Sequence, residues 1–381
     1  MKTIAITAAL AAILLGTVLA EPSFAKEKQI AYIDAASSTT FVPLRFVSGY
    51  IGANVEWSQA TGRIEIRHQG NSVAIDVGKT SAEMKDGSQI ALPAPSFNEN
   101  GVTYVPLKLL SAAFGVQLDW QANTSSVLLT LPDKSITLPA VPRGSLTAGK
   151  PAITNQQKTF VVGKKTFSVQ MVTVSLLDPR IDLDIALAGD EVGKVEELKG
   201  IADRNGAVLA INGTFFDAYT ESAFKKPYGF LANDGDLLYN NSERRATFTY
   251  DTNYLAEIIG GGDFAQRYRT GTMDGALQAG PRLIENGKVA LNVEDEGFRD
   301  PKILTGGGAR SALGITRDHK LILLTTGGAT IPQLADIMKQ AGAYQAMNLD
   351  GGASSGLYYN GKYLTQPGRL ISNAIIVKLE S

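Results

Sequence analysis

The chain has 381 residues, no cysteine, two histidines and a formal net charge of −1, because 36 Lys and Arg nearly balance 37 Asp and Glu. The balanced charge excludes a global attraction to nucleic acid or anionic lipid, so we expect no nucleic-acid partner. The residue counts exclude disulfides, zinc thiolates, a thiol nucleophile, a multi-histidine metal centre and most catalytic triads. The length favours two or more domains, with cores large enough to fold without disulfides.

Residues 1–25 have the pattern of a secretory signal peptide. Met1-Lys2 precedes an apolar run from Ile4 to Ala20, and the small residues Ser23 and Ala25 suit cleavage after Ala25. A transmembrane anchor needs about 20 apolar residues with retained flanks, and this run is shorter. We therefore expect export by this signal peptide to a secreted or cell-wall-associated location, with no integral membrane segment in the mature chain.

A duplicated unit follows. Residues 41–48 (FVPLRFVS) recur as residues 104–111 (YVPLKLLS), and the same offset places Gly52 on Gly115 and Trp57 on Trp120. In each copy a proline opens an amphipathic helix and a glycine ends it before a strand. The predicted unit is strand, helix, strand, strand.

Residues 26–133 resemble the copper amine oxidase N-terminal domain-like family, a small module of exported bacterial proteins, through the Val-Pro-Leu-Arg motif, the glycine and the Trp-ended strand. We expect no copper here, because His68 is the only soft ligand candidate and a lone histidine is usually polar surface. The module is either an attachment domain that contacts the cell wall or a structural spacer.

Residues 134–154 carry several turn formers and little apolar periodicity, and they predict a linker to a second domain over residues 155–381. The turn formers are Pro139, Pro142, Gly144, Gly149 and Pro151. After the linker, the alternating stretches 166–176 and 181–187 predict paired strands, and residues 192–205 predict a helix that ends at Gly206.

Polar residues follow a short buried strand predicted over residues 208–211. Asn212 and Asp217 place an amide and a carboxylate at the end of this strand. A local turn bonded to its own backbone is the alternative explanation for both residues. Further along, Gly280-Pro281 predicts a turn with Arg282 beside it.

A second set of polar residues surrounds the predicted strands near the C-terminus. Arg310 stands at the entrance of a buried strand, where it is either a surface charge or a clamp for two phosphate oxygens. Residues 321–325 predict a strand, and residues 331–341 predict a helix with Pro332 in its first turn. The helix leads into a strand over residues 344–349.

The stretch after that strand, Asp350-Gly351-Gly352-Ala353-Ser354-Ser355, combines a carboxylate, two glycines and two hydroxyls. The glycines let a ligand approach the backbone N–H groups, and the serines add neutral donors beside a fixed negative charge. We interpret this stretch as the floor of an active site. An ordinary Asp-Gly turn between two strands is the alternative.

Four strings, taken together and in this order, resemble the phosphodiester glycosidase family: AINGTFFD (210–217), GPRL (280–283), RSALG (310–314) and NLDGGASS (348–355). The likeness extends from about Phe167 to Val377, with departures at Thr214 and Ala353. It implies hydrolysis of the bond between the anomeric carbon of a sugar and a phosphodiester, which gives free sugar and a phosphomonoester.

Carboxylates and arginine suit that reaction, because a phosphate leaving group needs charge neutralisation more than a proton. We assign Arg310 to the phosphate and Asp350 to the oxocarbenium-like centre or to water activation, with Asp217 in reserve and Asn212 as an orienting group. The predicted substrate-binding residues are Gly213, Gly280, Arg282, Gly351, Gly352, Ser354 and Ser355. We expect no cofactor and no metal ligand, although the sequence leaves a divalent metal open.

Two other functions compete with the glycosidase. A phosphodiesterase would break P–O bonds, usually with paired metals held by many His and Asp ligands. A non-catalytic protein would bind cell-wall glycan without turnover. We favour an α+β fold, with a duplicated module followed by a larger mixed β-sheet domain with a few helices, acting on a sugar-1-phosphodiester or a phosphodiester-linked surface glycan.

Overall fold

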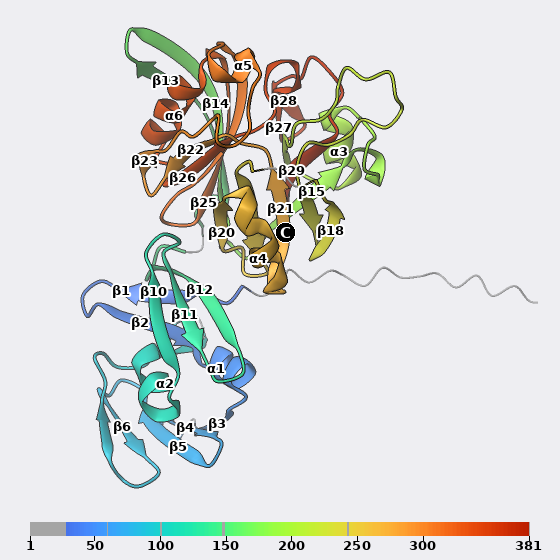
Figure 1. Cartoon of the computed structure of the whole chain (residues 1–381). Helices are drawn as coiled ribbons and strands as arrows, with labels where there is room; N and C mark the ends of the chain where they lie inside the picture. The colour runs from blue at the N-terminus through green and yellow to red at the C-terminus, as the bar shows by residue number, and fades with distance from the viewer. Residues whose placement is uncertain (1–27, 59, 100, 147–148, 242–243, 381) are drawn as a thin grey trace, which may run out of the picture.

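The computed structural model describes residues 28–380 except residues 59, 100, 147–148 and 242–243. The chain is 15% helical and 46% strand, in agreement with a β-rich α+β fold. It divides into an N-terminal module, residues 28–142, and a C-terminal domain, residues 153–380, which lies above the module in Figure 1. The predicted signal peptide falls outside the described residues. None of the described helices has the length and apolar character needed to cross a membrane.

The N-terminal module contains two sheets and two short helices. Its seven-stranded sheet has the order β10 (Gln117–Gln121), β11 (Ser126–Thr130), β12 (Ser135–Pro142), β1 (Ala31–Asp34), β2 (Thr39–Pro43), β9 (Val102–Pro106) and β8 (Phe97–Glu99). Its five-stranded sheet has the order β3 (Asn54–Ser58), β4 (Arg63–His68), β5 (Asn71–Asp76), β6 (Ser81–Met84) and β7 (Gln89–Ala91).

The order strand, helix, strand, strand appears twice in this module, as β2-α1-β3-β4 and as β9-α2-β10-β11. Helices α1 (Leu44–Ile51) and α2 (Leu107–Phe114) each follow a proline and end at a left-handed glycine, Gly52 (φ 71°) or Gly115 (φ 70°). A side chain at either glycine would strain the turn that sends the chain into the next strand.

The predicted linker is partly wrong, because residues 135–142 form β12 inside the sheet of the module. This strand pairs with β11 in antiparallel fashion and with β1 in parallel, and it buries Leu138 and Val141. The prolines that suggested a linker are compatible with the strand because its other backbone groups still pair. The connection between the two parts is therefore shorter than the sequence predicted.

The C-terminal domain contains three sheets and the helices α3 (Leu198–Arg204), α4 (Phe264–Arg269), α5 (Pro301–Leu304) and α6 (Ile331–Gln340). The seven-stranded sheet has the order β13 (Ile153–Val162), β14 (Lys165–Ser175), β25 (Lys320–Ala329), β24 (Gly308–Ile315), β26 (Gln345–Asn348), β22 (Arg282–Glu285) and β23 (Lys288–Val289). One five-stranded sheet has the order β15 (Ile181–Leu187), β29 (Asn373–Leu379), β16 (Leu209–Asn212), β27 (Leu357–Tyr359) and β28 (Lys362–Thr365). The other has the order β18 (Asp236–Tyr239), β17 (Leu231–Asn233), β21 (Met273–Gln278), β19 (Thr247–Asp251) and β20 (Ala256–Ile259).

Two local predictions differ from this arrangement. Strands β14 and β15, predicted to pair, belong to different sheets, because β14 pairs with β13 and β25 whereas β15 pairs with β29. The helix predicted over residues 192–205 begins only at Leu198, since Glu196 forms a bridge with Ile371. The predicted helix of residues 331–341 is confirmed as α6, which starts with a capping box between Thr330 and Gln333.

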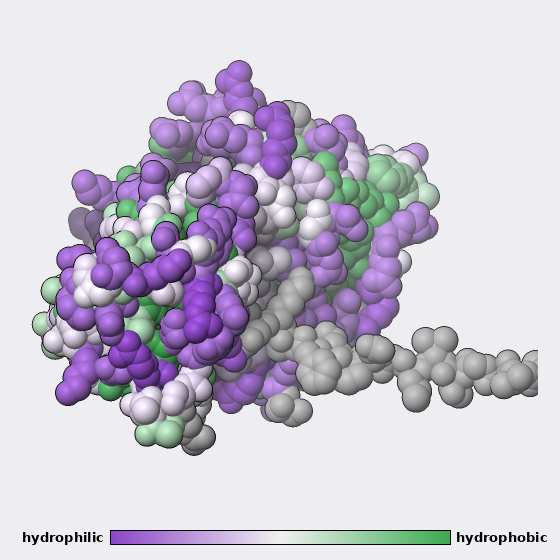
Figure 2. Space-filling view, turned by 90° about the horizontal axis from the view of Figure 1, so that it is seen from below, coloured by the Kyte–Doolittle hydropathy of each residue, from purple (hydrophilic) through white to green (hydrophobic). Residues whose placement is uncertain are grey.

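One hydrophobic core joins the three sheets of the C-terminal domain. It contains Val174, Leu183, Phe248, Leu313 and Ile375, which come from β14, β15, β19, β24 and β29. The ends of strands from different sheets therefore meet over one core. Seen from the module's end of the molecule, the surface is mostly hydrophilic, with hydrophobic residues gathered in smaller areas (Figure 2).

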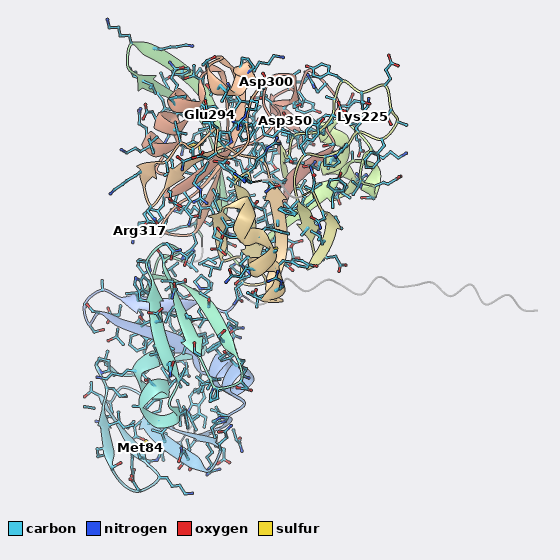
Figure 3. All side chains as sticks on the ribbon, in the orientation of Figure 1. Met84, Lys225, Glu294, Asp300, Arg317 and Asp350 are labelled. Carbon is cyan, nitrogen blue, oxygen red and sulfur yellow. The ribbon has the colours of Figure 1, made fainter. Side chains whose placement is uncertain are left out.

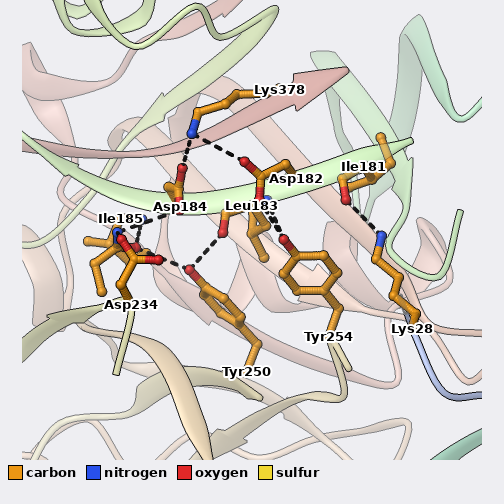
Figure 4. Close-up of polar contacts among 11 residues, drawn as sticks. Lys28, Ile181, Asp182, Leu183, Asp184, Ile185, Asp234, Tyr250, Tyr254 and Lys378 are labelled. Carbon is orange, nitrogen blue, oxygen red and sulfur yellow. Dashed lines mark hydrogen bonds and ion pairs between the residues drawn. The ribbon is translucent and has the colours of Figure 1, made fainter. Parts of the chain in front are cut away.

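The N-terminal module is attached to the C-terminal domain by buried polar contacts as well as by the chain. The Lys28 ammonium donates hydrogen bonds to the carbonyls of Leu176, Asp178 and Ile181 at 2.9, 2.5 and 2.7 Å, and the last of these is visible in Figure 4. It also lies 4.3 Å from the centre of the Tyr254 ring. Desolvation by burial lowers the pKa of Lys28 to about 7.

Two more residues of the C-terminal domain contact the N-terminal module. The His319 ring, 3% exposed, has its Nε2 within 3.1 Å of the Ser125 carbonyl and 3.3 Å of the Ala140 carbonyl. Gln345 donates from Nε2 to the Asn123 carbonyl at 3.2 Å and accepts from the Ile258 N–H at 2.7 Å. Because Gln345 begins β26, the interface touches the strand that leads to Asp350.

These contacts predict how the chain responds to a single cut between the two parts. Trypsin should cleave after the exposed Arg143, whereas the Lys150-Pro151 bond resists it. The two fragments should stay together, because the buried hydrogen bonds of Lys28, His319 and Gln345 do not depend on the connection. Gel filtration after digestion should give one peak with both fragments. Two separate peaks in native buffer would show that the interface does not hold the parts together.

Candidate active site

The turn that follows β26 is fixed by the ends of two neighbouring strands. The Leu349 N–H donates to the Ser311 carbonyl of β24 at 2.8 Å, and the Asp350 N–H donates to the Gly213 carbonyl at 3.0 Å. The Asn212 amide at the end of β16 donates from Nδ2 to the Asp350 carbonyl at 2.7 Å. The polar strand ends predicted from the sequence are therefore adjacent, with Asp350 where they meet.

Asp350 opens into a cavity of about 770 Å³. In Figure 3 Asp350 and Asp300 lie near the end of the C-terminal domain that faces away from the N-terminal module, whereas Arg317 lies close to the module. The cavity is lined by five cationic side chains, Arg245, Arg299, Lys302, Arg310 and Arg369, and by three carboxylates, Asp217, Asp300 and Asp350. Its aromatic lining consists of Phe215, Phe216, Tyr219, Tyr228 and Phe298. The cavity therefore has an excess of positive charge beside an aromatic wall.

The Asp350 carboxylate is the most perturbed acid in the cavity. Desolvation by burial raises its pKa from the ordinary value of 3.8 to about 7, although the hydroxyl of Ser354, the charge of Arg369 and the Gly351 N–H act in the opposite direction. It forms no ion pair within the described part of the chain. A carboxylate with this pKa can exchange a proton near neutral pH, which is the property required of a general base.

Arg310 is a fixed cation in the cavity wall and is 3% exposed. Its Nε donates to the Ala329 carbonyl at 3.0 Å, and its Nη2 donates to the carbonyls of Lys302 and Gly306 at 2.7 and 2.8 Å. These acceptors are neutral, so the positive charge is not cancelled by a carboxylate of the described residues. Burial lowers the pKa of Arg310, but an arginine pKa is high enough for the side chain to remain charged.

Because Gly351 has no side chain, one guanidinium nitrogen of Arg310 can lie beside the turn that carries Asp350. A Cβ on Gly351 would lie 3.1 Å from the Ala309 carbonyl and 3.6 Å from Nη1 of Arg310. Nη1 is the guanidinium nitrogen that makes none of the three carbonyl contacts. The absence of a side chain thus leaves Nη1 beside the turn that carries Asp350. Gly352, with φ of 60°, completes this turn.

Several predicted site residues lie behind the cavity wall. Asn212 is fully buried, and its Oδ1 accepts hydrogen bonds from the Ser311 hydroxyl at 2.7 Å and the Gly356 N–H at 3.0 Å. Together with its bond to Asp350, these contacts occupy both ends of the amide. Gly213 packs against Asn373 and Leu277, because a Cβ there would lie 2.1 and 2.6 Å from their side chains. Both residues hold the turn and do not line the cavity.

Gly280 and Arg282 also lie outside the cavity lining. Gly280 has φ of 84°, precedes a cis peptide bond to Pro281, and its carbonyl accepts from Asn348 Nδ2 at 2.9 Å. The Arg282 guanidinium contacts Glu285 at 2.6 Å and the Ile258 carbonyl at 2.9 Å. The predicted role of Arg282 as a substrate cation therefore has no support from its position.

The remaining predicted residues divide between the cavity and its support. Asp217, Gly351 and Gly352 line the cavity. Ser354 and Ser355 are 1% and 3% exposed and lie in the short turn behind Asp350. Only Ser354 is close enough to the Asp350 carboxylate to lower its pKa.

Residue-by-residue sequence analysis missed most of the basic wall. Arg245, Arg299 and Lys302 come from loops and from α5, where no apolar pattern marks them. Arg369 lies within the stretch that resembles the family, from about Phe167 to Val377, but outside the four strings, and its sequence context gave no chemical role. An arginine or lysine in an irregular segment is usually surface charge, so only its position in the fold separates it from the others.

The two histidines do not gather other metal ligands. Among residues 28–380, apart from the few positions left undescribed, no three His, Cys, Asp or Glu side chains are close enough together to hold a metal ion. His68 instead packs edge-on against Phe114 with ring centres 5.9 Å apart, and His319 lies in the interface between the two parts.

The site thus combines a half-buried acid, Asp350, with a fixed cation, Arg310, in a basic cavity. Comparison with known families shows what the two parts of the chain are similar to. Residues 205–378 match the phosphodiester glycosidase family, and residues 23–129 match the copper amine oxidase N-terminal domain. The two resemblances inferred from the sequence are confirmed, each over the part of the chain where it was expected.

Solved structures show the same fold at low identity. The catalytic domain of zebrafish N-acetylglucosamine-1-phosphodiester alpha-N-acetylglucosaminidase, auto-inhibited by a pro-peptide, is 19% identical with a TM-score of 0.53 and covers 61% of this chain and 86% of that chain. A hypothetical protein from Synechocystis is 15% identical with a TM-score of 0.52 and covers 92% of this chain and 96% of that chain. No curated protein matches the sequence.

The raised pKa of Asp350 predicts a pH-dependent gain in stability for Asp350→Asn. The folded protein, with a pKa of about 7, holds the proton more tightly than the unfolded chain, with a pKa of 3.8, so the parent loses stability as the pH rises through 4 to 7. The neutral amide avoids this loss. The variant should therefore melt higher than the parent at pH 8, and less so at pH 5, in thermal unfolding followed by circular dichroism. A melting difference that is the same at both pH values would contradict burial of the charge.

Proposed function

We propose that the protein is an exported hydrolase that cleaves the glycosidic bond of sugar-1-phosphodiesters and releases free sugar and a phosphomonoester. The observation that carries the proposal is the presence, in one cavity, of a half-buried carboxylate, whose pKa desolvation raises to about 7, and a fixed arginine, neither of which is neutralised by an ion pair among the described residues. Opposite charges kept apart from other partners are available to a substrate. A phosphodiester-linked surface glycan is the substrate class that fits this proposal.

The proposed reaction assigns one task to each group. The bond between the anomeric carbon and the phosphate oxygen breaks, and its electron pair stays on that oxygen. Arg310, held by three carbonyls, stabilises the charge of the departing phosphomonoester without needing to reorient. Asp350 accepts the proton of the water molecule that adds to the anomeric carbon, and the proton passes to solvent when the products leave. Phe215 and Phe298, whose rings are 5.7 Å apart and lie under the Arg245 guanidinium, line the part of the cavity that we assign to the sugar.

The decisive measurement identifies which bond breaks. Hydrolysis of N-acetylglucosamine-1-phosphoglycerol in water enriched in ¹⁸O should place the label on the anomeric hydroxyl of the released sugar. Label in the phosphate would instead identify a phosphodiesterase. Binding of the substrate without any release of reducing sugar would identify a glycan-binding protein.

Asp350→Asn should strongly reduce this turnover, because the amide keeps the shape of the turn but cannot accept a proton. We expect kcat/KM to fall by about a hundredfold or more. In the parent, kcat/KM should rise with pH and level off above pH 7, since the charged form of Asp350 is the active one. A variant with normal turnover, or a parent rate that falls above pH 7, would remove Asp350 from the role of base.

Arg310→Lys should lower turnover by about tenfold to a hundredfold, because a single ammonium cannot keep the three carbonyl bonds and also face the phosphate. The matched control is Arg267→Lys, since Arg267 also makes three side-chain hydrogen bonds, with Glu257, Thr270 and Thr272, and does not line the cavity. Both variants should lose some thermal stability, but only Arg310→Lys should lose activity. Equal activity losses in the two variants would indicate a general effect of destabilisation.

A further inference from the structure

An arginine and a tyrosine are paired at the exposed end of the cavity, and the proposed hydrolysis gives neither of them a contact with the substrate, although the charge of Arg369 lowers the pKa of Asp350. Nη2 of Arg369 donates to the Tyr219 hydroxyl at 2.8 Å, and the guanidinium lies 4.9 Å from the centre of the Tyr219 ring. Both residues line the cavity, yet Tyr219 is 79% exposed. The ring and hydroxyl of Tyr219 are therefore accessible to a ligand that enters the cavity from solvent.

The pair has a defined position relative to Asp350. The Gly368 N–H, next to Arg369, donates to the Ala353 carbonyl at 2.8 Å, so the pair is attached to the outer end of the Asp350 turn. Arg310 lies at the inner end, beside Gly351. The cavity therefore has a deep cation at one end of the turn and a partly exposed cation at the other.

The loop that carries Tyr219 is held on both sides. Phe216 and Pro227 form a bridge across its base, and the Lys225 N–H donates to the Gly193 carbonyl at 2.8 Å. Because the tyrosine oxygen already accepts from Arg369, its own O–H proton remains to be donated. The two side chains thus present a cation and a neutral donor at the same place.

The charge of the cavity exceeds what one phosphodiester needs. Five cationic side chains line it against three carboxylates, an excess of two positive charges when all are ionised. A phosphodiester carries one negative charge, which the proposed reaction places at Arg310. The excess that remains favours a substrate with another anionic group.

We propose that Arg369 and Tyr219 bind a second anionic group of the substrate, on the leaving-group side of the phosphodiester. We choose this side because Tyr219 is 79% exposed at the opening of the cavity, and the chain beyond the phosphate is the part of a polymeric substrate that extends into solvent. The inference rests on the proposed function and deepens it. The preferred substrate is then a phosphodiester-linked chain with repeated negative charges.

Two probes that differ by one phosphate test this inference. The first is N-acetylglucosamine-1-phosphoglycerol, and the second is the same compound with a further phosphate on the glycerol. At low salt the parent should show about tenfold higher kcat/KM on the second probe, the gain expected from one charge-assisted contact. Arg369→Gln should abolish this preference, and Tyr219→Phe should reduce it by removing the donor while keeping the ring.

The control variant is Arg317→Gln. Arg317 stacks on Tyr344 at 4.6 Å in a pair of the same kind, but Figure 3 places it close to the N-terminal module, far from Asp350. This variant should keep the full preference for the second probe. Loss of preference in both arginine variants would overturn the assignment, because it would reflect net charge and not position. A third probe with the extra phosphate on the sugar should show no gain. A gain with this probe would place the second anion on the sugar side and overturn the assignment to the leaving-group side.

Failure of the inference can be distinguished from failure of the proposed function. Equal kcat/KM on the first two probes would overturn the second anion site while hydrolysis stands. If neither probe is turned over, the proposed hydrolysis is wrong. Calorimetric Kd values for the two probes then still test whether Arg369 and Tyr219 bind a second anionic group. Tighter binding of the doubly charged probe that disappears in Arg369→Gln supports the site, and equal Kd values overturn it.

Discussion

The site depends on the hydrogen bonds made by the buried side chain of Asn212. One buried amide donates to the backbone of Asp350 and accepts from Ser311 and from Gly356, so it joins segments that are far apart in the sequence. Loss of the amide would leave several buried polar groups unpaired, each at a cost of about 1–3 kcal/mol. The amide therefore supports the reactive carboxylate from behind, although it was predicted to face the substrate.

The charges at the site are held by neutral groups. Three carbonyls position Arg310. The backbone of Asp350 donates to the Gly213 carbonyl and accepts from the Asn212 side-chain amide. Positioning by neutral dipoles fixes each charge without cancelling it, whereas a structural ion pair would stabilise the fold and remove both charges from chemistry. The raised pKa of Asp350 is the cost of this arrangement, and it is also what makes the carboxylate useful near neutral pH.

The N-terminal module is linked to the same strand that carries the site. Gln345 contacts the module at the start of β26, and Asp350 follows the end of that strand. Lys28 and His319 add further polar contacts between the two parts. The module is therefore part of the support of the C-terminal domain, a role that its sequence, with a run of prolines and glycines after it, did not indicate.

The sequence by itself determined the local elements, the two family resemblances and the stretch of the chain that holds Asp350. Apolar periodicity, proline at helix starts and glycine at helix ends are local signals, and α2, α6 and β26 follow them closely. Only the tertiary structure decided that β12 belongs to a sheet, that Arg282 turns away from the cavity and that Arg369 turns toward it. Such outcomes depend on which strands pair and where loops cross, and these are long-range contacts that leave no pattern in neighbouring residues.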